Sequence, residues 1–450
     1  MPGLIAEHGI GRAAIPPQNL RGKSTRKYGH PRGIQGQQNE SEPVRNSRTF
    51  SMHTEWIQNS ADRYDACNRA TLNWLMARGS LSGGFLNTKV HSITGKDYDA
   101  ASGARGPDYT YGWIQGRGLE ALSSFVIHYK GLDPAFSDRL RKTGAALYRR
   151  LAEKQAGDGH AYFLYGPDGQ PVISQNGTLT PQAPAGSVYT YSDAFVSKGL
   201  FAASHLYEPE MSGNYLTYLK EVIAAVEDGR FQMDETKPLS QESIAAEPDD
   251  FGPRMILLAA SGLLHRLGYS EETDFADRFI AHVLDRHFDP DSGLLLTIHG
   301  EDICNVGHAI EFCGFAFEHL AVRPDQERLD RIVDILLRCM EIGMQGPGIA
   351  LYLSASSGAL KSPYFPWWPM PEAIRACALG YQLTGDSRLI APWKKADAAF
   401  FTQYWRQDLG FAYQTRTVDG PVDFVPATPD LDPGYHTGLS LLAAIRSARR

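Results

Sequence analysis

The chain has 450 residues, of which 42% are hydrophobic and 21% are charged, and it carries a formal net charge of −7. Its apolar content is sufficient for a large core, and its negative charge argues against nucleic acid as the main partner. Because the sequence contains neither an apolar run of about 18 residues nor a signal sequence, we expect no membrane partner and a cytoplasmic location.

The first 50 residues differ in composition from the rest. They contain eight Lys or Arg against three Glu, a net charge of +5, so residues 51–450 carry −12. Gly, Pro, Gln, Asn and Ser are frequent in them, and their apolar surface is too small to offset the entropy lost on ordering. We predict a disordered basic extension over residues 1–50 and a single catalytic domain over residues 51–450. An organellar presequence is the alternative, although no amphipathic helix is evident.

From residue 55 onward, apolar residues recur with helical spacing in twelve segments. The segments are 55–78, 113–130, 135–156, 191–207, 212–228, 253–267, 272–287, 306–321, 325–345, 368–384, 388–406 and 434–448. They form six pairs, because long links rich in Gly, Pro and Asp alternate with short links. The long links lie inside the pairs, at 79–112, 157–190, 229–252, 288–305, 346–367 and 407–433.

A repeated array of helix pairs is either an open solenoid or a closed toroid. Six pairs fit closure, so we predict an all-α fold, an (α/α)6 barrel whose second helices form the inner ring. The N-termini of the inner helices and the long links would then gather at one end. We expect short β-hairpins in these links, for example residues 411–413 with 418–422 around an Asp-Gly turn. Helix N-termini also concentrate positive potential, which favours a site at this end.

Polar, ionisable or aromatic residues begin every second helix, whereas the later turns are mostly Ala, Leu, Phe and Ile. Each of them also has a purely structural interpretation, such as an ion pair between Arg117 and Glu120 or a core position for Trp368. Their recurrence at all six starts favours a functional site. They are Tyr111, Trp113 and Arg117; Tyr191 and Asp193; Arg254; His308 and Glu311; Trp367, Trp368 and Glu372; and Tyr435 and His436.

The start of the segment 306–321 combines a histidine with a carboxylate. Asn305 can cap this helix with its side-chain oxygen, which places His308 in the first turn and Glu311 on the same face. The pair is either a core histidine held by a carboxylate or part of a catalytic site.

Four stretches carry a resemblance to a known family. They are residues 113–117 (WIQGR), 307–311 (GHAIE), 367–373 (WWPMPEA) and the pair Tyr435-His436. In order and spacing they resemble the N-acylglucosamine 2-epimerase family, over residues 55–448. That family includes sugar 2-epimerases and aldose-ketose isomerases, all on (α/α)6 barrels.

The sequence departs from the family pattern at two places. Met370 stands where the family usually has a polar residue such as histidine, and residues 429–434 replace a Lys-Gly-Gly segment before the last histidine. Residues 191–195 and 253–258 are closer to the acylglucosamine epimerase and aldose-ketose isomerase branches than to cellobiose epimerases. Both departures concern the sugar-binding wall and therefore the identity of the sugar.

The resemblance implies an isomerase that acts on a mannose-type, glucose-type or N-acylated hexose, with a homodimer as one oligomeric state. His308 and His436 would be the acid/base pair, Glu311 would orient His308, and Arg117 would stabilise an enediolate. The residues implied in sugar binding are Tyr111, Trp113, Asp193, Arg254, Trp367, Trp368, Glu372 and Tyr435.

Histidine suits this chemistry because its pKa near 7 allows it both to take and to return the proton next to a carbonyl. Two histidines that reach opposite faces of C2 would give epimerisation, and a proton returned to C1 would give a ketose. The scheme requires no cofactor. We also expect no metal, because the Glu-x-x-His spacing of di-iron bundles occurs here only in reverse, at 308–311, and without a partner copy.

Two other classes of function remain open. One is a glycoside hydrolase or lyase that uses carboxylates among Asp193, Glu311 and Glu372. The other is a sugar-binding relative without catalysis, which would keep the tryptophans and tolerate loss of both histidines. The fold alone cannot distinguish them. The five cysteines are scattered without CxxC spacing, which fits reduced thiols rather than a disulfide framework.

Overall fold

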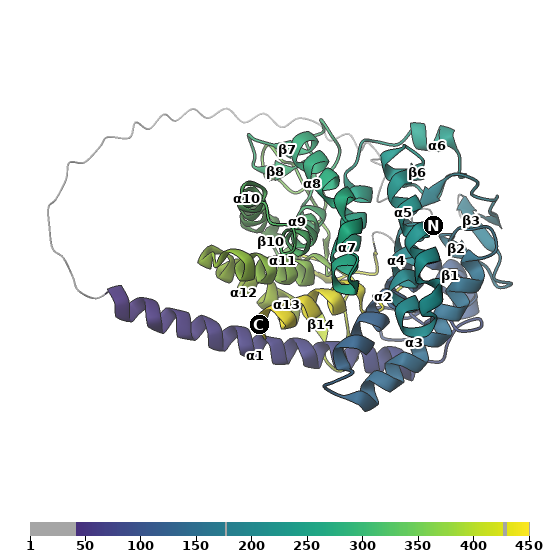
Figure 1. Cartoon of the computed structure of the whole chain (residues 1–450), viewed down its shortest axis with the longest axis horizontal. Helices are drawn as coiled ribbons and strands as arrows, with labels where there is room; N and C mark the ends of the chain where they lie inside the picture. The colour runs from purple at the N-terminus through teal and green to yellow at the C-terminus, as the bar shows by residue number, and fades with distance from the viewer. Residues whose placement is uncertain (1–41, 176–177, 426–429, 450) are drawn as a thin grey trace.

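The computed structural model of the chain describes residues 42–175, 178–425 and 430–449, with side chains from residue 53 onward. Residues 1–41 of the predicted extension lie outside the described residues. The first helix, α1 (Glu42–Ala77), begins before the domain boundary predicted at residue 51. Figure 1 shows this helix along one edge of the molecule, beside the C-terminal helix.

Twelve helices in the described residues form the six predicted pairs. The pairs are α1 with α2 (Gly112–Tyr129), α3 (Pro134–Gln155) with α4 (Tyr191–Tyr207), α5 (Ser212–Glu227) with α7 (Gly252–Leu267), α8 (Asp274–Arg286) with α9 (Val306–Leu320), α10 (Gln326–Gly343) with α11 (Pro369–Thr384), and α12 (Ile390–Ala399) with α13 (Ser440–Ala448). A short helix, α6 (Gln241–Ala245), lies in the link before α7. The π-helical turns η5 (Phe400–Tyr404) and η6 (Tyr435–Leu439) extend the last pair.

Local sequence explains where these helices begin and end. The side chain of Asn305 accepts a hydrogen bond from the backbone N–H of His308 at 3.1 Å, which confirms the predicted cap of α9. Gly268 and Gly385 follow α7 and α11 with φ of 87° and 68°, a left-handed conformation that favours glycine.

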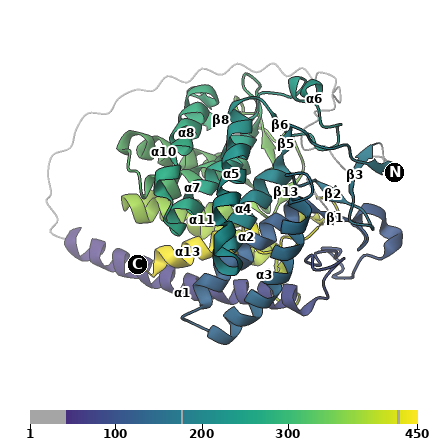
Figure 2. The ribbon, with the colours of Figure 1, turned by 45° about the vertical axis from the view of Figure 1, so that its right-hand side comes forward.

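The second helices of the pairs form the inner ring. Each contacts the next in chain order, α2 to α4, α7, α9, α11 and α13, and η6 returns to α2. Inner helix α9 is buried on nearly all sides, whereas outer helix α10 buries one face only. The predicted all-α fold of helix hairpins is confirmed. Figures 1 and 2 both show α1 packed beside α13.

Close backbone packing joins the first two inner helices. A Cβ at Gly116 of α2 would lie 2.6 Å from the backbone of Phe195, and one at Gly199 of α4 would lie 2.6 Å from the carbonyl oxygen of Gly116. The absence of side chains at these two positions therefore lets α2 and α4 cross in contact.

Short strands lie in the links, as predicted, and four of them directly precede the inner helices α2, α4, α9 and α11. The sheets are β1-β2-β3-β4, β5-β6, β7-β8, β9-β12, β10-β11, β13-β16-β17 and β14-β15, all antiparallel except β5-β6. The bounds are β1 (Thr110–Tyr111), β2 (Leu164–Tyr165), β3 (Pro171–Gln175), β4 (Thr178–Pro181), β5 (Tyr189–Thr190), β6 (Phe231–Gln232), β7 (Phe288–Asp289), β8 (Leu294–Leu295), β9 (Cys304–Asn305), β10 (Met344–Gln345), β11 (Gly348–Ile349), β12 (Tyr352–Leu353), β13 (Phe365–Pro366), β14 (Trp405–Arg406), β15 (Phe411–Ala412), β16 (Thr415–Thr417) and β17 (Gly420–Pro421).

The predicted hairpin in the last link is displaced. Residues 411–412 pair with 405–406, and the hairpin is formed by 415–417 with 420–421, so that Val418 and Asp419 make the turn. The Asp-Gly signal located the turn approximately, but the first strand lies at different residues from those predicted.

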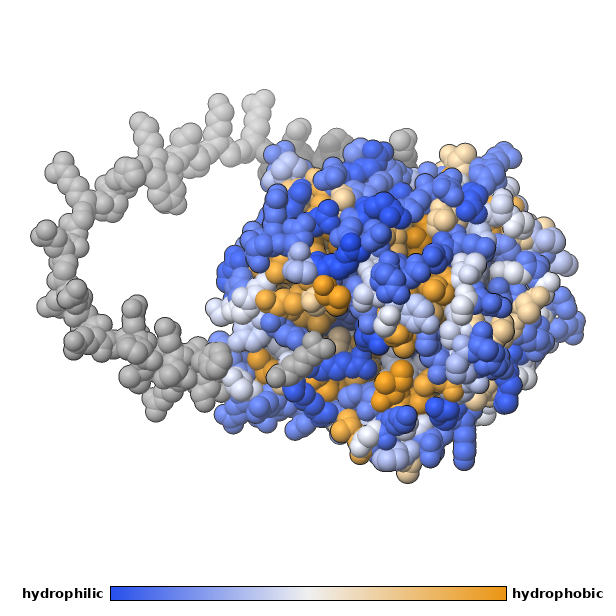
Figure 3. Space-filling view, in the orientation of Figure 1, coloured by the Kyte–Doolittle hydropathy of each residue, from blue (hydrophilic) through white to orange (hydrophobic). Residues whose placement is uncertain are grey.

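Polar residues dominate the surface in Figure 3, with apolar residues scattered in small groups. Among the described helices, none has the length and apolar character to cross a membrane. All five cysteines are buried with free thiols, as expected for reduced residues.

Candidate active site

Five of the six inner helices bring their first turns together. Arg117 of α2 lies over the rings of Phe195 of α4 and Tyr435 of η6, with its Cζ 4.1 and 5.5 Å from their centroids. His308 of α9 lies beside Trp368, the N-cap residue of α11. These contacts and those described below bring Trp113, Arg117, His308, Glu311, Trp367, Trp368, Glu372, Tyr435 and His436 together.

The indole of Trp368 is the common neighbour of the two candidate catalytic histidines. Its ring centroid is 5.4 Å from that of His308 and 5.5 Å from that of His436, and both imidazoles are tilted by 36° to it. The indole packs directly on Gly307, where a Cβ would lie 2.3 Å from Cη2. Because Gly307 precedes His308, this contact fixes the indole against the first turn of α9.

His436 is held by a buried carboxylate. It is 6% exposed, and its Nδ1 lies 3.0 Å from Oε1 of the fully buried Glu372, whose other oxygen lies 3.0 Å from Nη1 of Arg375. Burial, reinforced by the guanidinium of Arg117, holds the pKa of His436 well below its usual value. A neutral imidazole that donates its Nδ1–H to a carboxylate keeps a lone pair on Nε2. When Glu372 is ionised, His436 is therefore a base whose lone pair lies on Nε2.

Glu311 belongs to the same network, on the side of His436. Its Oε1 lies 3.7 Å from Nδ1 of His436, whereas the resemblance implied that it would orient His308. Burial, followed by the charge of Glu372, raises the pKa of Glu311 to about 8. Burial likewise raises the pKa of Glu372 to about 7. Both carboxyls therefore titrate closer to neutral pH than an ordinary glutamate does, beside a neutral imidazole.

The turn that carries His436 is anchored by an aspartate. Oδ1 of Asp432 accepts hydrogen bonds from the backbone N–H groups of Tyr435 and His436 at 2.9 and 3.3 Å, and Oδ2 accepts one from Thr437 at 2.9 Å. Gly434 enters the turn with φ of 89°. The segment that departs from the family pattern thus supplies the cap of the last inner helix.

Three predicted sugar-binding aromatics lie around this network with only small exposed areas. Tyr111, Trp113 and Trp367 are 7 to 8% exposed. The Cζ of Arg117 lies 4.8 Å from the ring of Trp113, and Nε1 of Trp367 donates a hydrogen bond to the hydroxyl of Thr437 at 3.3 Å. His308 and Arg117 are more exposed than these rings, so they are the most accessible polar groups of the cluster.

Tyr435 and Glu372 are placed differently from what the resemblance implied. The hydroxyl of Tyr435 accepts a hydrogen bond from Nζ of Lys198 at 2.7 Å, and the residue is 2% exposed. Glu372 is occupied by His436 and Arg375. Both side chains therefore hold other residues of the site in place, since their polar atoms contact protein groups and not a sugar.

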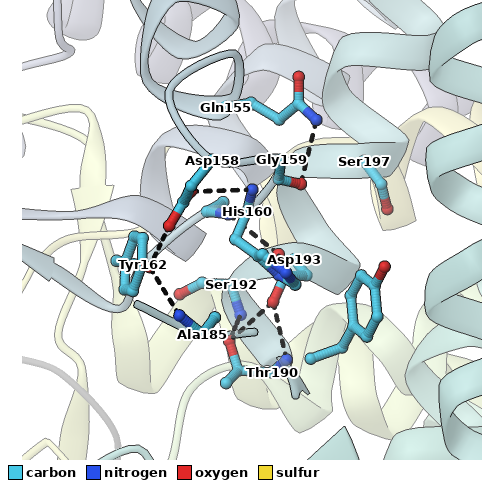
Figure 4. A network of polar contacts seen from close by, with 12 residues as sticks. Gln155, Asp158, Gly159, His160, Tyr162, Ala185, Thr190, Ser192, Asp193 and Ser197 are labelled. Atoms are coloured by element: carbon cyan, nitrogen blue, oxygen red, sulfur yellow. Dashed lines mark hydrogen bonds and ion pairs between the residues drawn. The ribbon is translucent and has the colours of Figure 1, made fainter. Parts of the chain in front are cut away.

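Asp193 is held by contacts within the protein. It is 1% exposed and occupies the third position of α4, where it completes a capping box with Thr190. Its Oδ1 accepts hydrogen bonds from the hydroxyl of Tyr218 at 2.6 Å and the N–H of Ala161 at 2.9 Å, and it contacts His160. Figure 4 shows His160 and Thr190 converging on this carboxylate.

Arg254 lies apart from the histidines. Its Cζ is 5.9 Å from the ring centroid of Phe279 on the outer helix α8, and burial lowers its pKa. It therefore faces the outer ring, and the predicted sugar contact is not supported.

Glu311, Glu372 and His436 each offer a ligand atom within 4.8 Å of the others, a residue set that suits a carboxylate-histidine metal site. However, Arg375 contacts Glu372, and the charge of Arg117 acts on both carboxyls. Because Nδ1 of His436, the ring nitrogen that faces both carboxyls, is already hydrogen-bonded to Glu372, we assign the cluster as an acid/base network.

Lys198 and Arg375 are parts of the site that sequence reasoning missed. Lys198 is fully buried and lies 3.5 Å from Glu120, so that Glu120 pairs with Lys198 and not with Arg117. Burial lowers the pKa of Lys198. Each is a charged residue within an otherwise apolar helical segment. This pattern is the signal by which the sequence could have identified them.

Comparison with protein families and with curated sequences finds no match. Solved structures do match. The cellobiose 2-epimerase from Bacillus thermoamylovorans B4167 is 16% identical with a TM-score of 0.66, over 88% of this chain and 99% of that one. A D-mannose isomerase is 11% identical with a TM-score of 0.66, over 86% and 97%. The chain has the fold of these sugar enzymes.

The cellobiose 2-epimerase from Spirochaeta thermophila DSM 6192 is similar to the same degree. It is 15% identical with a TM-score of 0.65, over 88% of this chain and 98% of that one. At these identities the likeness establishes the shared fold, and the reaction must be argued from the site.

Proposed function

We propose that the protein is a carbohydrate 2-epimerase in which one histidine removes the C2 proton of a hexose and a second histidine donates a proton to the opposite face. The observation that carries the proposal is the placement of His308 and His436 on different inner helices around the indole of Trp368. The tautomer of His436 is set by Glu372, which leaves Nε2 as a base. The fold shared with sugar 2-epimerases and a mannose isomerase is consistent with this function.

The reaction follows from these groups. One histidine takes the proton from C2 of the open-chain aldose, and the electron pair of the C–H bond passes to the carbonyl oxygen to give an enediolate. Arg117 stabilises the negative oxygen. The second histidine, protonated, returns a proton to the other face of C2, and the aldose of inverted configuration forms. Trp113, Trp367 and Trp368 offer apolar faces to the sugar ring.

The aldose-ketose isomerase is the close alternative. It uses the same enediolate and differs only in that the proton returns to C1. The site contains both groups that either outcome needs, so the product decides between them.

The hydrolase alternative receives less support from the geometry. A glycoside hydrolase needs two carboxyl groups that flank the scissile bond. Glu311 and Glu372 are 4% and 0% exposed and both lie near Nδ1 of His436, and Asp193 is enclosed by its cap. These carboxyls are not positioned to flank a substrate.

The test is proton NMR of sugars incubated with the protein in deuterated water. The panel contains mannose, glucose, N-acetylmannosamine, cellobiose and a sulfonated hexose, and His308→Ala and His436→Ala are measured in parallel. We expect deuterium at C2 together with the epimer, and a loss of turnover of about 10²- to 10⁴-fold in each variant. His265→Gln is the matched control, since both ring nitrogens of His265 contact other side chains and it lies in the last turn of α7.

Each other outcome has a defined meaning. A ketose product would assign the isomerase. Hydrolysis of cellobiose, or full activity of His436→Ala, would contradict the proposal and favour the hydrolase. Quenching of tryptophan fluorescence by a sugar without exchange at C2 would indicate a binding protein.

A further inference from the structure

We propose that the chain holds a divalent transition-metal ion of the zinc class at Asp249, His282 and His287, a site separate from the candidate active site. Each residue offers one ligand atom, and the three atoms lie within 4.8 Å of one another. Two imidazoles and one carboxylate are the ligand set of three-residue zinc sites, in which water completes a tetrahedron.

The three ligands come from segments that the fold holds together. Asp249 lies three residues before α7, His282 lies in α8, and His287 follows directly after α8. The backbone N–H of His299 bonds to the carbonyl oxygen of Asp249 at 2.9 Å, and Leu296 bonds to that of His287 at 2.7 Å. These bonds tie the link to the hairpin β7-β8, which Figure 1 shows beyond the end of α8.

The hydrogen bonds of His287 prepare it for a metal. Its Nδ1 donates to the carbonyl oxygen of Leu296 at 2.9 Å, because a carbonyl can only accept. The proton is therefore fixed on Nδ1, and Nε2 carries the lone pair. A backbone carbonyl in this position is the usual partner of a histidine that binds metal through its other nitrogen.

Buried nitrogens without partners supply an independent reason. His287 is 0% exposed, and within the described residues neither its Nε2 nor that of His282 has a hydrogen-bond partner. A buried polar atom without a partner costs about 1–3 kcal/mol. These atoms belong to the two histidines that each bring a ligand atom within 4.8 Å of Asp249, so a shared cation accounts for both together.

Asp249 is oriented by a hydrogen bond from a neighbouring arginine, and a second arginine lies near the cluster. Nε of Arg286 donates a hydrogen bond to its Oδ2, which fixes the orientation of the carboxylate. Arg286 and Arg254 are the cationic groups near the cluster, and both oppose the charge of a bound ion. Because two of the three ligands are imidazole nitrogens, the site favours zinc, cobalt or nickel, which bind imidazole well, over magnesium or calcium, which prefer oxygen.

The role of the ion would be to link the segment before α7 to the outer helix α8.

The proposal is tested with untagged, EDTA-treated protein and Co²⁺ as the spectroscopic probe. We expect binding of one Co²⁺ per chain with the strong visible absorption of a tetrahedral site, displacement by Zn²⁺, and a higher Tm with Zn²⁺. Asp249→Asn, His282→Gln and His287→Gln should each weaken Co²⁺ binding by at least about 10-fold.

Two control variants distinguish this site from Co²⁺ binding elsewhere on the chain. His265→Gln and Glu311→Gln should bind Co²⁺ as the wild type does, because neither changes a ligand of this site. Asp249→Asn keeps the shape of the link, so it remains informative if His287→Gln fails to fold. Absence of stoichiometric Co²⁺ binding by the wild type, or unchanged affinity in Asp249→Asn and His282→Gln, would overturn the proposal. Loss of binding in Glu311→Gln would move the ion to the His436 cluster and also overturn it.

Discussion

His436 and Glu372 form one functional unit across two inner helices, since Nδ1 of the imidazole lies 3.0 Å from a carboxylate oxygen that is itself fully buried. The sequence separates them by 64 residues, and neither is positioned without the other. The tautomer of the base in the proposed reaction is therefore set by Glu372, which does not itself contact the substrate.

Replacement of this carboxylate tests the unit. Glu372→Gln keeps the shape but removes the charge that selects the Nδ1–H tautomer of His436. We expect kcat to fall on the order of 10²-fold with little change in KM, and the pH profile of kcat to shift. Glu318→Gln, at a half-buried position in the last turn of α9 where the carboxylate pairs with Arg266, is the matched control and should retain activity. A loss confined to KM would indicate that Glu372 binds the sugar directly.

The packing of Trp368 on Gly307 gives a second prediction. In Gly307→Ala the new Cβ would overlap Cη2 of the indole, so Trp368 must move away from both histidines. We expect a loss of about 1–3 kcal/mol in the free energy of unfolding and a fall in kcat/KM.

The overlap can be isolated by a double-mutant cycle. In a Trp368→Phe background the same Gly307→Ala change should cost less, because the smaller ring leaves room. Urea unfolding and C2 exchange rates measure both effects. Equal costs in the two backgrounds would show that the indole does not fix this position.

Asp193 should influence stability rather than substrate binding. Asp193→Ala removes the capping box of α4 and leaves the hydroxyl of Tyr218 buried without its acceptor. We expect a loss of about 2–4 kcal/mol in the free energy of unfolding, with KM unchanged in the folded protein. Adding Tyr218→Phe should recover part of the loss. A raised KM with unchanged stability would restore the predicted sugar contact.

The raised pKa of Glu311 predicts a specific pH dependence of stability. Its pKa is about 8 in the folded protein against an ordinary 4.5, so the folded state binds the proton more tightly. The stabilising contribution is complete below about pH 4.5 and is lost as pH rises through about 8. The lowered pKa of His436 acts in the opposite direction, but only below its ordinary value of 6.5.

The range from pH 6.5 to 8.5 therefore isolates the carboxyls. We expect the wild type to lose about 1–2 kcal/mol more than Glu311→Gln over this range in urea unfolding. Glu235, whose pKa is also raised by burial, contributes to both proteins and cancels in the difference. Equal losses in the two proteins would show that Glu311 is ionised in the folded state.

The helices could be predicted from sequence because their apolar spacing and alternating links are local patterns. The cap at Asn305 could be predicted for the same reason. The capping box of Thr190 and Asp193 is also visible in the sequence, but the position of the aspartate at the start of an inner helix favoured sugar binding instead. The contact between Glu372 and His436 depends on how two helices pack, so no local pattern distinguishes it from a contact between Glu311 and His308.

The π-helical turn at Tyr435–Leu439 has a consequence for alignment and engineering. A π turn holds one residue more than an α turn, which is equivalent to a single inserted residue. Deleting one residue from 437–439 would restore the α register and rotate the preceding side chains by about 100° relative to α13. His436 would then turn away from Glu372 without any change of its own identity. An alignment with any protein whose helix lacks this turn should therefore allow a gap of one residue here.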